Sequence, residues 1–407
     1  MDTGDTAWIL VSAALVLFMT PGLALFYGGM DRTRNILNML MMNFWCLLII
    51  PVVWAVLGFS LAQSGDGAFL GNLDLAFLRG LDLNEDGGAS LVTMAFLGMF
   101  AVITPALIAG AVAGRMKFSA WAVFAPVWLL LVFAPVFKWV YGGWIGDRGA
   151  LDFAGGTAIH VNAGVAALAA VLVLGKRRGW PDRIRPPHSM PLVMLGAGIL
   201  WFGWFGFNAG SALAANGQAI QAFVNTFLAS AAGGLSWSLV ERYRDGHFTN
   251  LGAASGIVAG LVAITPAAGF VAGMAPILIG IAAGVACYFA VSLKSRLGYD
   301  DALDVVGVHL VGGLVGSLAI GLFAEPEFFG GDFMAGLFHG GGLQLLGEQI
   351  MGNSATIVYC FVVTTLIMVV LRATIGIRVS PEVEDSGLDL AEHAETGYGS
   401  DSIGVAG

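Results

Sequence analysis

Two histidines lie in the middle of long apolar segments of this 407-residue chain. His160 ends the stretch Asp-Phe-Ala-Gly-Gly-Thr-Ala-Ile-His over 152–160, and His309 ends Asp-Val-Val-Gly-Val-His over 304–309. An ionisable side chain at the depth of a membrane is costly to keep there, so it is a functional-site candidate by default. Each histidine also has an aspartate upstream in its own segment. The pairing indicates a path for a small polar or ionisable species through an apolar protein.

The residue types around the two histidines disfavour metal binding and nucleophilic catalysis. A metal site usually needs three or four ligands, and no cysteine or carboxylate is suitably spaced near either imidazole. Nucleophilic catalysis needs a serine or cysteine beside an imidazole, and nothing completes a triad around Ser211. We therefore expect no metal, no cofactor and no enzyme activity.

Paired neutral imidazoles suit a small molecule that both donates and accepts hydrogen bonds. A neutral ring offers one donor and one acceptor, and burial disfavours its charged form. A bare monovalent cation finds few partners in such a place. Ammonia is neutral and small, and it can be passed between ring nitrogens.

The composition indicates a protein whose surface meets lipid. The chain is 57% hydrophobic and 11% charged, with a mean hydropathy of +0.83, whereas soluble domains carry about 25% charged residues. No basic stripe or nucleic-acid motif is present, so we expect no nucleic-acid partner.

Eleven segments are long and apolar enough to cross a bilayer, which takes roughly 17–25 residues. They lie at about 6–29, 36–62, 91–113, 119–141, 154–175, 190–210, 219–240, 250–269, 271–292, 304–323 and 352–374. The segment over 250–269 is the weakest, because it is short and rich in glycine. We expect an all-α integral membrane protein with eleven transmembrane helices.

The distribution of basic residues orients these spans, because short cytoplasmic loops collect Lys and Arg. With the N-terminus outside and the C-terminus inside, 15 of the 18 basic residues fall on the inner side. Only Arg79, Lys138 and Arg148 fall outside. The outer loop after the second span is acidic, with Asp66, Asp74, Asp82, Glu85 and Asp86. Such a loop favours cations near the mouth.

The two histidines lie in the fifth and tenth spans, which indicates two repeats of five spans and one extra helix. Because an odd number of spans per repeat inverts the second copy, such repeats place a site near the midplane. We expect a transmembrane domain over 1–378, with pseudo-repeats at about 6–175 and 190–323 and the extra helix at 352–374. The tail over 379–407 is acidic; we expect it to be solvated, with docking on the basic inner loops as the alternative.

Aromatic residues gather at the outer ends of several spans. Phe96 and Phe100 lie one turn apart on the third span, Trp204 and Phe207 end the sixth, and Tyr141 ends the fourth. A belt of aromatic residues at the membrane interface explains any one of them. A cluster that converges on one mouth could instead bind a cation through ring faces, at about 0.5–2 kcal/mol per contact. Ser211 could accept a hydrogen bond from that cation.

Several ordered motifs make the chain similar to a known family. They are Pro-Gly-Leu-Ala-Leu-Phe-Tyr-Gly-Gly-Met (21–30), Leu-Asp-Phe-Ala-Gly-Gly-Thr (151–157), Trp-Phe-Gly-Phe-Asn-Ala-Gly-Ser (204–211), Ile-Thr-Pro-Ala-Ala-Gly (264–269) and Gly-Val-His (307–309). The tail adds Gly376-Ile-Arg378-Val and Gly387-Leu-Asp389 followed by His393. Over essentially its whole length the chain resembles the ammonium transporter family (the Amt/Mep/Rh group), most closely its bacterial and archaeal Amt branch.

The resemblance implies roles for the residues that match the family's motifs. His160 and His309 would be twin pore histidines, and Phe100 and Phe207 the gate above them. Phe96, Tyr141 and Ser211 would form the outer site that recruits ammonium. Asp152, Trp204 and Thr265 would support the site without being its main contacts.

The resemblance also implies partners and a location. The chain would form a homotrimer in the lipid of the cell's inner, cytoplasmic membrane, crossing it many times, and would conduct ammonium, ammonia and methylammonium. Its cytoplasmic face would bind a PII-type regulatory protein. The alternatives are an ammonium sensor that signals through its tail, a Rh-like gas channel, and an intramembrane enzyme. The absence of a fused signalling domain disfavours the sensor.

One departure from the family concerns the outer mouth. Tyr141 stands where the family usually has Trp, and Lys138 replaces a common His. Tyr has a weaker ring face than Trp for a cation, and a lysine near the mouth would repel one. We expect weakened recruitment with an intact pore, unless Trp139 or Trp144 compensates.

Overall fold

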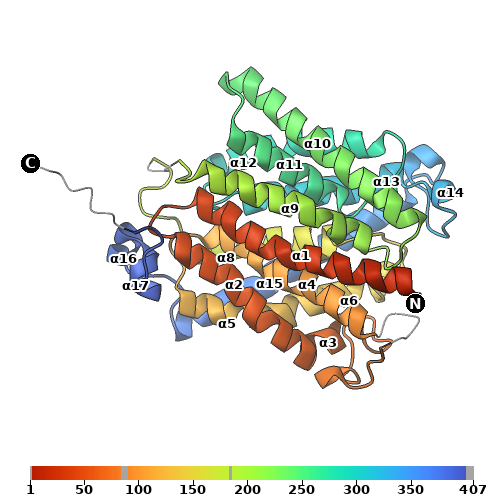
Figure 1. The fold of residues 1–407 in the computed structure, drawn as a ribbon, viewed down its shortest axis with the longest axis horizontal. Helices are drawn as coiled ribbons and strands as arrows, with labels where there is room; N and C mark the ends of the chain where they lie inside the picture. Colours follow the sequence, from red (N-terminus) through yellow and green to blue (C-terminus); the bar gives the residue numbers. More distant parts are fainter. Residues whose placement is uncertain (1, 84–89, 183–185, 400–407) are drawn as a thin grey trace, which may run out of the picture.

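Long helices packed side by side make up most of the chain (Figure 1). This computed structural model describes residues 2–83, 90–182 and 186–399. Within these ranges the regular structure is helical. Two isolated β-bridges are present, and no β-strand forms in the described residues. Four residues of the predicted loops fall outside the described ranges: the acidic Glu85 and Asp86, and Arg183 and Arg185, which we counted on the inner side. The end of the tail over 400–407 also falls outside them.

Ten helices of the described chain are long and apolar enough to cross a membrane. They are α1 (Thr3–Met30), Ile36–Gln63, α4 (Leu91–Val112), Phe118–Asp147, Gly156–Leu174, α9 (Met190–Gly210), α10 (Gly217–Asp245), α12 (Ala275–Leu297), Val306–Phe323 and α15 (Gln344–Thr374). The chain is therefore a multi-pass membrane protein.

The remaining elements are parts of these helices or short helices beside them. The composite spans contain α2 (Ile36–Val53), α3 (Phe59–Gln63), α5 (Phe118–Trp128), α6 (Ala134–Val140), α7 (Trp144–Asp147), α8 (Asn162–Leu174) and α13 (Val311–Phe323). The short helices are α14 (Pro326–Phe329), α16 (Pro381–Ser386) and α17 (Leu388–His393), with 3-10 turns at Ala76–Leu78 and Leu337–His339.

Two predicted spans differ from the helices that form. The segment over 250–269 contains α11 (Asn250–Ile264), a helix of 15 residues that then continues as turns. Eleven crossings therefore stay a prediction. The last span begins at Gln344, well before the predicted 352. The prediction placed its start too late because Glu348 and Gln349 lower the hydropathy of this first part of the helix.

Two prolines inside the spans are each followed by a local change in the helix. Pro51 and Pro126 each precede a π-helical turn by three residues, at Trp54–Gly58 and Leu129–Phe133. Proline has no amide hydrogen and its ring displaces the carbonyl one turn back. A wider turn then lets the freed carbonyls find new donors.

Glycines let neighbouring helices approach closely, which is typical of a helix bundle in lipid. A Cβ atom at Gly233 of α10 would lie 2.6 Å from the carbonyl oxygen of Gly256 in α11. A Cβ at Gly280 of α12 would lie 2.3 Å from the carbonyl oxygen of Ala229. These glycines pack helices and do not bind phosphate.

The tail docks on one end of the bundle, opposite the N-terminus (Figure 1). Glu384 is 2% exposed and accepts hydrogen bonds from the Arg178 amide and the Arg378 guanidinium, both at 2.7 Å. Asp389 and Glu392 accept from the amides of Asn38 and Phe118, each at 2.9 Å. For these residues the expected solvated tail was wrong, and the docking alternative is confirmed.

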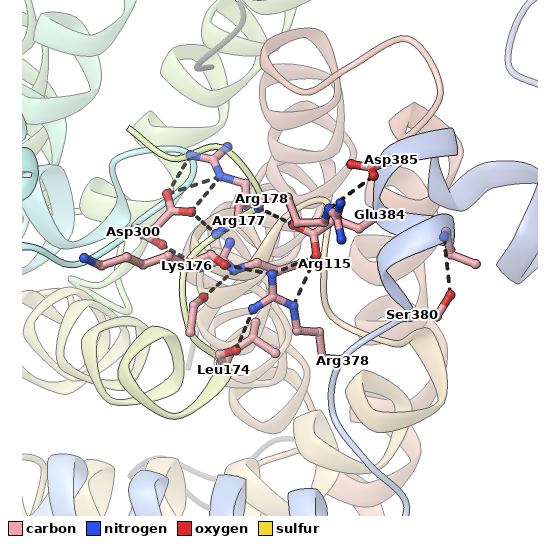
Figure 2. A network of polar contacts seen from close by, with 12 residues as sticks. Arg115, Leu174, Lys176, Arg177, Arg178, Asp300, Arg378, Ser380, Glu384 and Asp385 are labelled. Atoms are coloured by element: carbon pink, nitrogen blue, oxygen red, sulfur yellow. Dashed lines mark hydrogen bonds and ion pairs between the residues drawn. The ribbon is translucent and has the colours of Figure 1, made fainter. Parts of the chain in front are cut away.

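A network of arginines and carboxylates holds the loops at the same end (Figure 2). Arg177 binds Asp300 at 2.7 Å, while Arg115 donates to the carbonyl oxygens of Gly175 and Asp300. Burial raises the pKa of Asp300, but hydrogen bonds from Arg177 and the charge of Arg115 outweigh it, so this pKa lies below its ordinary value. The pair therefore stabilises the fold at neutral pH and loses that effect only as the pH falls into the acid range.

Candidate functional site

His160 and His309 face each other in the middle of the bundle. Their Nδ1 atoms lie 3.2 Å apart, and the rings are nearly parallel, with 19° between planes and 5.3 Å between centroids. Both side chains are buried, and the Nε2 atom of His160 has no protein partner. Because one Nδ1 must donate to the other, the neutral pair presents one Nε2 donor and one Nε2 acceptor.

Each histidine lies in a π-helical turn, at Gly156–Val161 and Val306–Leu310. π turns are rare and often occur at functional sites. The first turn starts on the carboxylate of Asp152, which accepts hydrogen bonds from four backbone amides. They belong to Gly155, Gly156, Thr157 and Ala158, at 2.7–3.0 Å.

Asp301, and not Asp304, is the counterpart of Asp152 in the second segment. Its Oδ2 atom accepts from the Val306 amide at 2.7 Å, whereas Asp304 binds Lys294. The sequence analysis paired His309 with Asp304, and that pairing was wrong. The correct signal is spacing, because Asp152 and Asp301 each precede their histidine by eight residues.

A pocket of about 170 Å³ lies beyond the first histidine turn. It brings together four of the predicted recruitment and gate residues, Phe96, Phe100, Tyr141 and Ser211. The Ser211 hydroxyl donates to the Phe207 carbonyl oxygen at 2.9 Å, so its lone pairs remain free to accept. Sequence reasoning missed the other lining residues. Phe153 and Ala154 lie in the quoted motif over 151–157, and the rest lie outside the quoted motifs: Gln63, Thr93, Leu97, Phe137 and Leu213.

Phe100 and Phe207 connect this pocket to the histidines. Their rings lie 4.3 Å apart between centroids, and the Phe207 centroid lies 6.0 Å from that of His160. Both phenylalanines are buried. The order along this line is pocket, Phe100, Phe207, His160 and His309.

Trp204 and Thr265 support the first histidine from the side. The Trp204 ring stacks on His160, with 5.5 Å between centroids and 21° between planes. Its Nε1–H donates to the Thr265 hydroxyl at 2.8 Å, and that hydroxyl donates to the Leu261 carbonyl oxygen. The indole is thereby fixed, and with it one face of the imidazole.

Lys138 does not line the pocket, so the repulsion that we expect from it is not a direct contact and stays a prediction. Lys138 is 4% exposed and donates to the Gly65 carbonyl oxygen at 2.7 Å. Trp139 and Trp144 also lie outside the pocket lining, so neither ring replaces Tyr141. Among the described residues, no group of three or more His, Cys, Asp or Glu side chains could hold a metal ion.

Comparisons with known proteins find the same family over nearly the whole chain. A family model for the Ammonium Transporter Family matches residues 7–398. An ammonium transporter of Mycobacterium tuberculosis (strain ATCC 25618 / H37Rv) is 51% identical, over 98% of this chain and 90% of the relative. Ammonium transporter Amt1 of Archaeoglobus fulgidus is 42% identical, over 98% of this chain and 100% of the relative.

Solved structures are similar in fold. The crystal structure of Candida albicans Mep2 has a TM-score of 0.88 at 36% identity, and covers 94% of this chain and 87% of that chain. A sensor Amt protein has a TM-score of 0.89 at 28% identity, with coverage of 96% and 98%.

Replacing Asp152 tests how strongly its carboxylate holds the first histidine turn. Asp152→Ala leaves four buried amides without an acceptor, so we expect a loss of roughly 3 kcal/mol or more in stability. Asp152→Asn keeps one acceptor oxygen and should lose less. Thermal unfolding in detergent measures the order, with exposed Asp147→Asn as the neutral control. Equal stability of the Ala and Asn variants would contradict this role.

Proposed function

The chain belongs to the Ammonium Transporter Family, and we propose that it conducts ammonium and ammonia across the cytoplasmic membrane. One observation carries the mechanism. A pocket lined by aromatic rings and one free serine acceptor leads through two phenylalanines to a buried, hydrogen-bonded pair of histidines.

The pocket recruits ammonium from the outer side. The ring faces of Phe96 and Tyr141 attract a cation, and the Ser211 oxygen accepts one of its hydrogen bonds. Methylammonium offers the same charge and three N–H donors, so it is a second substrate. The acidic loop with Asp66 and Asp74 raises the cation concentration nearby over about a Debye length, ~8 Å in physiological salt.

Phe100 and Phe207 form the gate between this pocket and the pore. A dehydrated cation beyond them would lose its water without gaining enough partners, which is costly. Ammonium therefore transfers its proton to water on the outer side of the gate, and the nitrogen continues as ammonia. Because the histidine pair presents one Nε2 donor and one Nε2 acceptor, ammonia finds complementary partners at His160 and His309.

We propose that these residues lie between two inverted repeats over about 6–175 and 190–323. The equal spacing of Asp152 and Asp301 from their histidines, each within a π turn, supports the repeat. With α11 as a short crossing, the domain over 1–378 has eleven spans, an outer N-terminus and a cytoplasmic tail over 379–407. The distribution of basic residues supports this orientation.

The protein works as a homotrimer with one pore per subunit, and a PII-type regulatory protein binds its cytoplasmic face. Both assignments rest on family membership. If the second is right, a PII protein should co-purify with this protein in a manner that changes between low and high 2-oxoglutarate. Equal recovery from a column without the transporter would contradict it.

The alternative is an ammonium sensor that signals through its tail. The similarity to a sensor Amt protein at a TM-score of 0.89 favours it, as does the docked tail. Identities of 42–51% to ammonium transporters favour transport. Uptake of methylammonium into vesicles that contain the protein separates the two functions.

Replacing His160 tests the neutral relay. Proteoliposomes that contain the wild-type chain should take up ammonium, followed as labelled methylammonium, and should not take up potassium. His160→Ala removes one hydrogen-bonding partner, worth about 1 kcal/mol, so discrimination against potassium should fall about fivefold or more. The Asp147→Asn variant serves as the control. Unchanged selectivity in His160→Ala would contradict the relay.

Replacing Tyr141 tests recruitment. Trp has the better ring face for a cation, by roughly 0.5–1 kcal/mol. Tyr141→Trp should therefore tighten the apparent affinity for ammonium about two- to fivefold, with little change in the maximal rate. Concentration-dependent methylammonium uptake measures both quantities. An unchanged apparent affinity would show that this ring does not bind substrate.

A further inference from the structure

One face of α15 carries a buried polar stripe through the apolar bundle. The stripe consists of Gln349, Asn353, Thr356, Cys360 and Thr364, none more than 3% exposed. Polar side chains inside a membrane are costly and are kept where they have specific partners. The helix itself lies outside both proposed repeats, so its partners indicate what it does for them.

Gln349 forms two hydrogen bonds with the segment just before the first histidine turn. Its Oε1 atom accepts from the Leu151 amide at 2.7 Å, and its Nε2 donates to the Leu151 carbonyl oxygen at 2.8 Å. The same Nε2 lies 3.0 Å from both the carbonyl and the hydroxyl oxygen of Ser317 on α13. Leu151 adjoins Asp152, which anchors the first histidine turn. The Gln349 side chain therefore connects that segment to α13, which follows the second histidine turn.

Asn353 makes a second bridge one turn deeper. Its Oδ1 atom accepts from the Thr157 hydroxyl at 3.1 Å, inside the π turn that carries His160. Its Nδ2 donates to the Ser317 hydroxyl at 2.6 Å and to the Gln349 carbonyl oxygen at 2.7 Å. Ser317 lies on the helix that continues from His309.

We propose that Gln349 and Asn353 are positioning residues that set the spacing of His160 and His309. The inference rests on the proposed function, in which the two rings must stay within hydrogen-bond distance. Neither amide touches the histidines. Each contacts the first histidine segment and α13 together, and both side chains are buried. Functional geometry of this kind depends on such supporting bonds to within about 0.5 Å.

A purely structural role makes a different prediction, and the same stripe offers the control. The Thr364 hydroxyl accepts a hydrogen bond from Trp128 Nε1 at 2.9 Å. Thr364 lies eleven residues after Asn353 on α15, which is ~16 Å of helix. Thr364→Val removes a buried hydrogen bond of the same kind without touching either histidine segment.

The test compares Asn353→Leu and Thr157→Val with Thr364→Val in proteoliposomes and by thermal unfolding. We expect all three to lower thermal stability. Only Asn353→Leu and Thr157→Val should lower the ammonium-to-potassium ratio, by about fivefold or more for one lost bond. Thr157→Ser keeps the hydroxyl and should restore the ratio. Where Asn353→Leu fails to fold, the Thr157 pair of variants carries the test.

A second measurement does not depend on transport. Spectra of the protein labelled with ¹⁵N-histidine report the hydrogen-bonded Nδ1 pair directly, and His160→Ala assigns its signals. These signals should shift in Asn353→Leu and Thr157→Val, and stay in place in Thr364→Val. Unchanged signals together with an unchanged ratio would overturn the positioning role. Shifted signals in Asn353→Leu and Thr157→Val, together with no ammonium flux through the wild-type chain, would instead overturn the proposed function alone.

Discussion

The hydrogen bond between the two Nδ1 atoms constrains the rest of this molecule. Two neutral imidazoles at 3.2 Å must hold complementary tautomers, and the two rings cannot both be charged without losing this hydrogen bond. Apolar surroundings make the constraint stricter, because a misaligned ring would find no water to bind. Most features around the pair restrict their motion: a carboxylate that anchors the first turn, an indole stacked on His160, and two amides of α15.

Much of this arrangement is predictable from the sequence, because membrane helices and pore residues leave strong local signals. Apolar length predicts most spans, and buried histidines together with family motifs predict which side chains meet. The predictions fail where the signal is polar or distant. The start of α15 is helical despite Glu348 and Gln349, which a hydropathy criterion reads as a loop.

Other misses arise from side-chain direction, which spacing along the chain does not specify. Lys138 donates to a backbone carbonyl oxygen and does not line the pocket. Phe137 and Phe153 line that pocket, although the sequence analysis assigned no role to either side chain. Asp304 is the nearer match to His309 in sequence, yet Asp301 is the residue that anchors the turn. Three-dimensional contacts decide each of these cases.

The docked tail has a consequence for how this protein is handled. Carboxylates of Asp389 and Glu392 occupy the first backbone amides of α2 and α5, helices that have no capping side chain of their own. A shortened clone that ends before Leu388 would strip both helix starts of an anion that complements their dipoles. Affinity tags and reporter fusions are therefore better joined beyond Tyr398 than used to replace the acidic segment.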